Sequence, residues 1–164
     1  MELFLNGRSL GTKVKPADDS PRSWEVTFEK GTLKAVAKNK GIVVTSEELK
    51  TAGNPARIIL TADKSKITKN WDDVSYVTAN VVDADGTTCP NADKLISFSV
   101  SGSGLISAVD NGDTNSHEAY QASDRHVFKG KCIAIIKAKT TSGKITVTAS
   151  SPELVSASVT IEVN

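Results

Sequence analysis

The chain has 164 residues, of which 38% are hydrophobic and 24% charged, so it can bury a core and is not a disordered segment. Its 20 basic and 19 acidic residues give a net charge of +1 and are spread along the sequence, which excludes the basic stripe of a nucleic-acid-binding protein. No apolar run is long enough for a membrane-spanning helix and no signal peptide is recognisable. Together with the charge distribution, this means that we expect neither nucleic acid nor membrane as a partner.

Residues 1–51 show short strand patterns and no helical periodicity. The pair Asn6-Gly7 stands between two apolar segments and favours the type I′ turn of a β-hairpin. Trp24 alternates with Val26, Phe28 and intervening polar residues, which predicts a half-buried strand with Trp24 in a core or an interface. The predicted strands are, in order, residues 3–5, 8–10, 24–28, 33–37 and 42–44.

This first piece is short for a β-sandwich. An immunoglobulin-type sandwich needs about seven strands and about 100 residues, and a much shorter piece buries too little surface to be stable alone. Residues 52–56, with Gly53 and Pro55, have the composition of a linker. We therefore expect residues 1–53 to be a truncated β-sandwich module with an unpaired sheet edge, followed by a complete module over residues 54–164.

The second piece has the strand pattern of a complete domain. Short alternating segments are separated by turn residues, and no helical pattern intervenes, which disfavours a parallel α/β fold. We predict an all-β fold, an antiparallel immunoglobulin-like β-sandwich. Its predicted strands are residues 57–62, 76–81, 96–100, 106–108, 132–138, 145–147 and 155–163.

The richest chemistry lies in the connection between residues 108 and 132. Asp110, Asn111 and Asp113 allow three interpretations: a turn built by Asx side chains, a calcium site, or a contact to sugar hydroxyls. The spacing is not that of an EF-hand. His117 and Glu118 complete the candidate ligand-binding residues of this loop, while Lys129 and Lys131 beside Arg125 are interpreted as a solvated face.

Two other features leave alternatives open. Trp71, next to two aspartates on a loop, is either an exposed platform for a sugar ring or a core or interface residue. Cys89 and Cys132 have no CxxC spacing, which excludes a zinc site of the usual kind. Free thiols are favoured, and a bridge between them requires that the fold bring them together.

No catalytic group is recognisable. Ser116, His117 and Glu118 have the letters of a triad, but neighbouring side chains on an extended chain point in opposite directions. Gly102 and Gly104 match the start of the dinucleotide-binding pattern, but Ser107 breaks it at its last position and no helix follows. We expect no cofactor and no metal.

The sequence resembles the modules that follow the catalytic barrel in bacterial β-galactosidases of glycoside hydrolase family 2. The first piece is similar to one such module, and residues 56–164 are similar to the next, C-terminal module. The matching segments are residues 1–11, 24–26, 31–36, 50–53, 76–78, 82–86, 98–102, 110–113, 116–118 and 128–132.

This resemblance implies a parent enzyme that hydrolyses β-galactosides with two glutamates of a (β/α)₈ barrel. The chain has no Asn-Glu pair and no βα repeats, so no catalytic residue can be carried over, and the chain alone should be inactive. The resemblance implies a non-catalytic accessory region whose partner is the barrel of the parent polypeptide, in the periplasm or outside the cell. Alternatives are a module that binds a β-galactoside or polysaccharide, and an adhesin-like immunoglobulin repeat.

Overall fold

The structure, a computed structural model, describes all 164 residues. The chain consists of two compact units, Met1–Thr51 and Ala52–Asn164. Every regular element in both is a β-strand, which confirms the predicted all-β class. The structure contains no helix that could cross a membrane.

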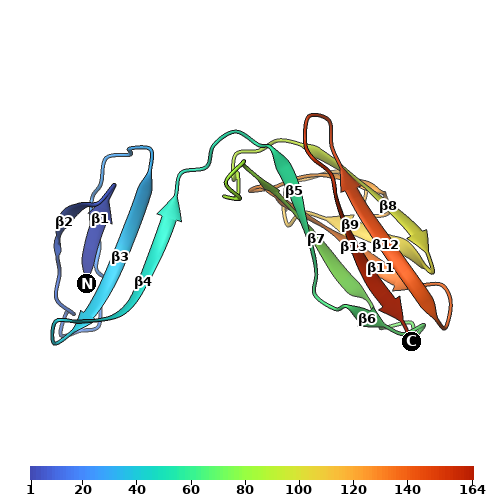
Figure 1. Cartoon of the computed structure of the whole chain (residues 1–164), viewed down its shortest axis with the longest axis horizontal. Helices are drawn as coiled ribbons and strands as arrows, with labels where there is room; N and C mark the ends of the chain where they lie inside the picture. The colour runs from blue at the N-terminus through green and yellow to red at the C-terminus, as the bar shows by residue number, and fades with distance from the viewer. The chain divides into compact units, whose positions relative to one another are not determined.

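The first unit is a single four-stranded antiparallel sheet (Figure 1). Its strands are β1 (Glu2–Leu5), β2 (Arg8–Thr12), β3 (Thr32–Asn39) and β4 (Ile42–Lys50), in the order β2-β1-β3-β4. Leu3, Leu5 and Val36 are its only buried apolar side chains, and every residue of the edge strand β4 is exposed.

The predicted hairpin is present and is tied to the start of β3. Asn6 and Gly7 have φ of 51° and 79°, as a type I′ turn requires. The Asn6 side chain accepts a hydrogen bond from the Thr32 N–H (2.8 Å) and donates to the Lys30 carbonyl (2.9 Å). Gly31 is needed beneath it, because a Cβ there would lie 1.7 Å from the Asn6 Oδ1.

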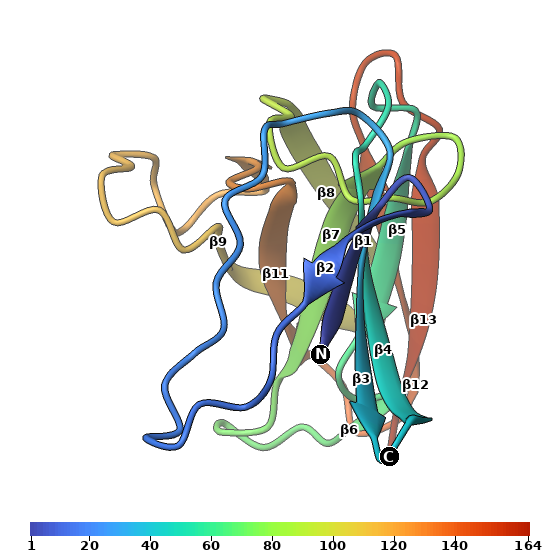
Figure 2. The same cartoon turned by 90° about the vertical axis from the view of Figure 1, so that its left-hand side faces the viewer.

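The predicted strand at residues 24–28 is wrong. The connection from β2 to β3 contains no strand (Figure 2), and within it Phe28 is 78% exposed. Alternation describes a chain with one apolar side, but a strand also needs a hydrogen-bonded neighbour, and neither sheet edge pairs with this segment. Trp24 is half-buried, with the Lys13 ammonium 5.3 Å from its ring centroid.

The second unit is a two-sheet sandwich. Its strands are β5 (Arg57–Ala62), β6 (Lys66–Ile67), β7 (Ser75–Val82), β8 (Leu95–Gly102), β9 (Gly104–Asp110), β10 (Asp124–His126), β11 (Lys131–Ala138), β12 (Gly143–Ser150) and β13 (Ala157–Val163). One sheet has the order β10-β8-β12-β13-β6 and the other β5-β7-β11-β9. All pairs are antiparallel except β6 with β13, so the predicted sandwich is confirmed.

The core lies between the inward faces of the two sheets. Side chains alternate along the central strands, so that Cys132, Ala134 and Ile136 of β11 are buried, as are Ile145 and Val147 of β12. This period of two is what the sequence pattern predicts for strands with one buried face.

Within the second unit, the Asp83 carboxylate binds the segment that precedes β5. Asp83 is 5% exposed, and its Oδ2 accepts a hydrogen bond from the Gly53 N–H (2.7 Å). Its Oδ1 accepts from the N–H groups of Asp85 (3.0 Å) and Thr87 (2.8 Å). These bonds, led by that from Gly53, lower the pKa of Asp83.

Candidate functional site

The polar loop forms the connection between β9 and β10, and Figure 2 shows it projecting beyond the strands. Its position follows from the strand register. β9 pairs with β11 as far as Asp110 opposite Ile133, and β7 pairs with β11 as far as Asn80 opposite Lys131. The loop therefore leaves the sheet at the end where β7 finishes.

Arg125 is the residue around which this loop is built. Its side chain is 0% exposed. Its Nη1 donates to the Glu118 carbonyl (2.9 Å), and its Nη2 lies 3.3 Å from Oδ1 of Asn111 and 3.5 Å from Oδ1 of Asp110. The Tyr120 ring centroid is 5.2 Å from the guanidinium carbon. One buried cation thus gathers three parts of the loop.

The predicted solvated face is present at Lys129 and Lys131, which are exposed, but Arg125 does not belong to it. Arg125 is the middle residue of β10 and pairs with Ile96, and it is the one buried residue of that strand. A guanidinium is tolerated there because carbonyl, amide and carboxylate oxygens surround it. Its Nε has no hydrogen-bond partner, although Oε2 of Glu118 lies 3.6 Å away.

The turn after β9 is of the Asx type. Oδ1 of Asp110 accepts hydrogen bonds from the N–H groups of Asn111 (2.7 Å) and Gly112 (3.1 Å), and Oδ1 of Asn111 accepts from Asp113 (3.0 Å). Gly112 alone takes the left-handed conformation, with φ of 74°. The turn accounts for much of the polar character of this sequence.

Glu118 is held at both oxygens. Oε1 lies 2.7 Å from Nδ1 of His126 and accepts from the His126 N–H (3.2 Å), while Oε2 accepts from the Ser116 hydroxyl (3.2 Å). Burial raises the pKa of Glu118, but the bonds from His126 and Ser116 outweigh it and leave the pKa below its usual value. Toward an ionised Glu118, Nδ1 of His126 is the hydrogen-bond donor.

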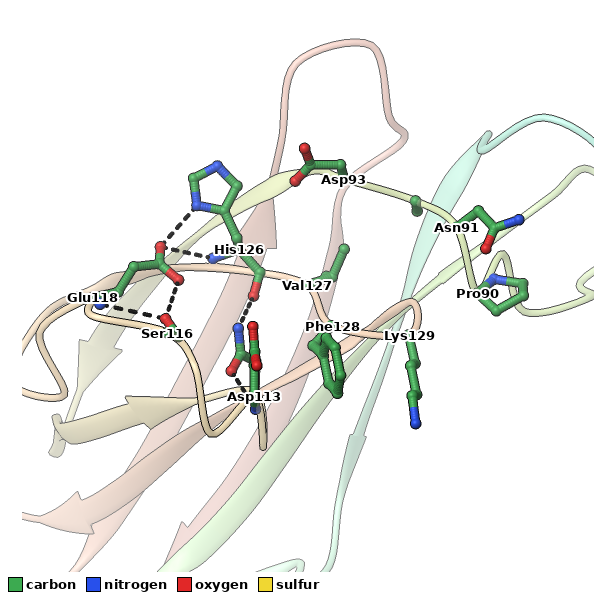
Figure 3. Close-up of a pocket in the computed structure, with 12 residues that line it drawn as sticks. Pro90, Asn91, Asp93, Asp113, Ser116, Glu118, His126, Val127, Phe128 and Lys129 are labelled. Atoms are coloured by element: carbon green, nitrogen blue, oxygen red, sulfur yellow. Dashed lines mark hydrogen bonds and ion pairs between the residues drawn. The ribbon is translucent and has the colours of Figure 1, made fainter.

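A pocket of about 540 Å³ opens beside this network (Figure 3). One wall is the connection from β7 to β8, residues 90–93, and the other is the β9–β10 connection. Residues 126–129 lie between them and contribute His126 and Phe128. The sandwich topology therefore joins three segments that are distant in sequence.

Only some of the candidate site residues meet in this pocket. Asn111, Asp113 and Glu118 line it. Asp110 lies outside its lining and is engaged by the turn, and His117 is exposed and also outside the lining.

Trp71 is not part of this site. It is 86% exposed, so it does not fill the core of the sandwich. It precedes β7, whose first residue, Ser75, pairs with Ile136, whereas the pocket lies near the other end of β7. The two candidate ligand contacts are therefore at opposite ends of one sheet.

Asn91, Asp93, His126 and Phe128 are among the pocket residues that the sequence did not identify as candidates. A local signal existed for Phe128, since it breaks the polar run before Gly130 without belonging to a strand. No local signal could join residues 90–93 to residues 126–129, because their proximity depends on the pairing of strands far apart in sequence.

The cysteines are two free, buried thiols. Cys132 is 1% exposed in the core, and burial raises its pKa to about 12, so it is an inert packing residue. The structure contains no group of three or more His, Cys, Asp or Glu side chains placed to hold a metal ion.

Comparison with known proteins gives a consistent result for both units. Residues 58–160 match the family model described as glycoside hydrolase family 2 C-terminal domain 5, and residues 1–45 match a domain of unknown function. The chain is 44% identical over 154 residues to β-galactosidase BoGH2A of Bacteroides ovatus, covering 94% of this chain and 18% of that protein.

Solved structures of glycoside hydrolase family 2 members also match this chain. A glycosyl hydrolase family 2 member from Bacteroides cellulosilyticus matches with a TM-score of 0.92 at 38% identity, over 99% of this chain and 21% of that one. A β-glycosidase from Bacteroides vulgatus matches with a TM-score of 0.91 at 31% identity, over 99% and 21%. The chain spans about a fifth of the length of these relatives.

Proposed function

This chain belongs to the C-terminal region of glycoside hydrolase family 2, and from this membership we propose that it is a non-catalytic accessory region of a larger enzyme that hydrolyses β-galactosides. The observation that carries the proposal is the match of residues 58–160 to the C-terminal domain model, in a chain that spans about a fifth of its relatives.

The state of Glu118 supports a non-catalytic role. A glycosidase acid must hold a proton at working pH, which requires a raised pKa, and its partner carboxyl group must face it across the scissile bond. Glu118 has a lowered pKa, and both of its oxygens are engaged by His126 and Ser116. Its carboxylate therefore stabilises the loop and is not placed to act as a catalytic acid.

The expected partner is a catalytic domain of the same polypeptide. The relatives are much longer polypeptides of family 2, which supports such an attachment. We propose that the catalytic domain is a (β/α)₈ barrel against which this region packs. We also propose a periplasmic or extracellular location, which cell fractionation tests.

Hydrolysis of a nitrophenyl β-galactoside tests the accessory role. The 164-residue chain alone should give no turnover, and deleting it from the longer polypeptide should lower the Tm or kcat/KM of the catalytic domain. Turnover by the chain alone that disappears in a Glu118→Gln variant would contradict the proposal. A deletion that changes neither Tm nor kcat/KM would contradict it as well.

A second candidate function is carbohydrate binding by the chain itself. The observation that favours it is the pocket in which Phe128 lies among carboxylate, amide and imidazole groups.

A further inference from the structure

We propose that the pocket between residues 90–93 and residues 126–129 binds a neutral, hydroxyl-rich ligand, the sugar units of an uncharged glycan, with Phe128 as the platform for one ring. This inference extends the carbohydrate-binding candidate function and does not require the accessory role. It rests on the composition, charge and hydrogen-bonding state of the pocket.

The pocket offers mainly hydrogen-bond acceptors. Asp93 is exposed and takes part in none of the hydrogen bonds or ion pairs of this region. Asp113 uses Oδ1 to accept from the Asn115 N–H (3.0 Å) and keeps Oδ2 free. Such a wall suits a ligand that carries many O–H donors.

The Asn111 amide and the His126 ring are held in place before a ligand arrives. Glu118 fixes the His126 ring through Nδ1 (2.7 Å), and the Asn111 amide donates to the His126 carbonyl (2.9 Å). Figure 3 shows the Asp93 carboxylate on the other wall, turned toward His126. Groups positioned in this way cost little ordering on binding, which favours a defined site over a mobile polar surface.

Phe128 supplies the apolar surface that a sugar ring needs. It is 37% exposed and lines the pocket between its two walls. An aromatic face packs against the C–H groups of a sugar ring, while the surrounding carboxylates and amides take its hydroxyls. A volume of about 540 Å³ is within the usual range for small-ligand pockets.

The charges of the lining select against ionic ligands. Asp93, Asp113 and Glu118 oppose an anion such as a uronate, and Lys129 is the one basic residue among them. The Lys129 ammonium lies 5.2 Å from the Phe128 ring centroid, so a cationic ligand at this ring would meet a like charge. A neutral glycan is the class that remains.

An NMR titration of the ¹⁵N-labelled 164-residue chain tests this inference. The probes are galactose, lactose and a neutral galacto-oligosaccharide, with glucuronate and choline as ionic comparisons. We expect saturable shifts for the neutral sugars at the amides of residues 91–93 and 126–129. Glucuronate and choline should give much smaller shifts at these positions.

Matched variants locate the site. Phe128→Ala and Asp93→Asn should each weaken binding about tenfold, because they remove the ring platform and one acceptor. Asp93→Asn serves if Phe128→Ala fails to fold, since the Asp93 side chain is exposed. Trp71→Ala and Asp72→Asn, exposed residues before β7, are the controls and should bind as the parent chain does.

Three results would overturn the proposal. One is the absence of saturable shifts for every neutral sugar. Another is binding that Trp71→Ala abolishes and Phe128→Ala leaves unchanged. The third is a response to glucuronate or choline that exceeds the response to neutral sugars. Each differs from a failure of the accessory role, which hydrolysis and deletion measure.

Discussion

Arg125 places a full positive charge where water does not reach it, and the loop after β9 is arranged to receive that charge. The Glu118 carbonyl, the Asn111 amide oxygen and the Asp110 carboxylate all lie within 3.5 Å of its terminal nitrogens. Because these groups come from the end of β9 and from two points of the β9–β10 connection, the guanidinium holds the pocket wall in shape without lining the pocket.

Replacing Arg125 with Met should therefore cost stability. Removing one partner of a buried charge network costs about 3–5 kcal/mol, and we expect the lower end, because Asp110 and Glu118 are 40% and 31% exposed and regain water. The free energy of urea unfolding measures the loss. Lys131→Met, an exposed change on β11, the next strand along the chain, is the control. Equal losses in the two variants would refute a structural role for Arg125.

Asp73 predicts a second measurable effect, on acid stability. Its carboxylate accepts from Lys64 Nζ (2.9 Å) and from the N–H and hydroxyl of Thr68 (2.8 and 2.9 Å), and these bonds lower its pKa from 3.8 to about 2. A lowered folded-state pKa stabilises the fold above the unfolded value and loses that effect as the pH falls through the folded value. The loss should fall between about pH 4 and pH 2.

The Tm measured between pH 2 and pH 7 checks this. Asp73→Asn should lower the Tm at neutral pH and flatten its decline between pH 4 and pH 2. Asp72→Asn, at an exposed neighbour, should keep the decline of the parent chain. An unchanged decline in Asp73→Asn would show that other carboxylates govern acid unfolding.

At the scale of elements, two glycines distinguish backbone conformation from close approach. Gly102, at the end of β8, has φ of 84°, and a Cβ there would lie 2.2 Å from the Lys144 carbonyl oxygen. Gly112, in the turn after β9, has a similar φ of 74° but no atom within 4 Å of such a Cβ. Alanine substitutions at these two glycines therefore separate the cost of a positive φ from the cost of a steric clash.

Gly102→Ala should destabilise the chain more than Gly112→Ala. Both alanines meet an unfavourable positive φ, at a cost of about 1 kcal/mol, but only the first must also push a strand backbone aside, which adds about 1–3 kcal/mol. Thermal unfolding of the two variants provides the comparison. Similar Tm values would mean that the β8–β12 pairing yields more easily than the close contact implies.

Strands with an alternating buried face and turn residues at their ends were predictable from sequence, whereas the pairing between strands was not. The period of two located β7, β11 and β12 because each has a buried face and turn residues at its ends. The same period failed at residues 24–28, where no neighbour pairs with the chain, and β10 is too short for any pattern. Alternating apolar residues show that a segment has one buried face, whereas the strand that pairs with it is determined by the fold.

The candidate site likewise combines residues that a local sequence pattern identifies with residues that only the fold brings together. Asn111, Asp113 and Glu118 were identified from a local cluster of polar residues and do line the pocket. Arg125 was misinterpreted because a charged residue in a polar stretch is usually solvated, and its burial depends on Ile96 and the β8 strand beside it. The opposite wall, residues 90–93, belongs to a loop that only the sandwich topology brings near.

At the scale of the whole molecule, the two units differ in how much apolar surface they bury. The first has three buried apolar side chains, Leu3, Leu5 and Val36, and an edge strand, β4, that is exposed throughout. The second has a continuous core between two sheets. Local opening is easier where few apolar contacts must be broken, so the units should have unequal opening free energies.

Amide hydrogen exchange on the 164-residue chain should reveal this inequality. We expect the hydrogen-bonded amides of β1 and β3 to exchange well before those of β7, β11 and β12, because opening the first sheet exposes few buried side chains. Low urea should erase protection in the first unit while the second keeps its own. A single protection level across both units, lost together in urea, would contradict the expectation and would show that the thin sheet is stabilised by more than its own three buried side chains.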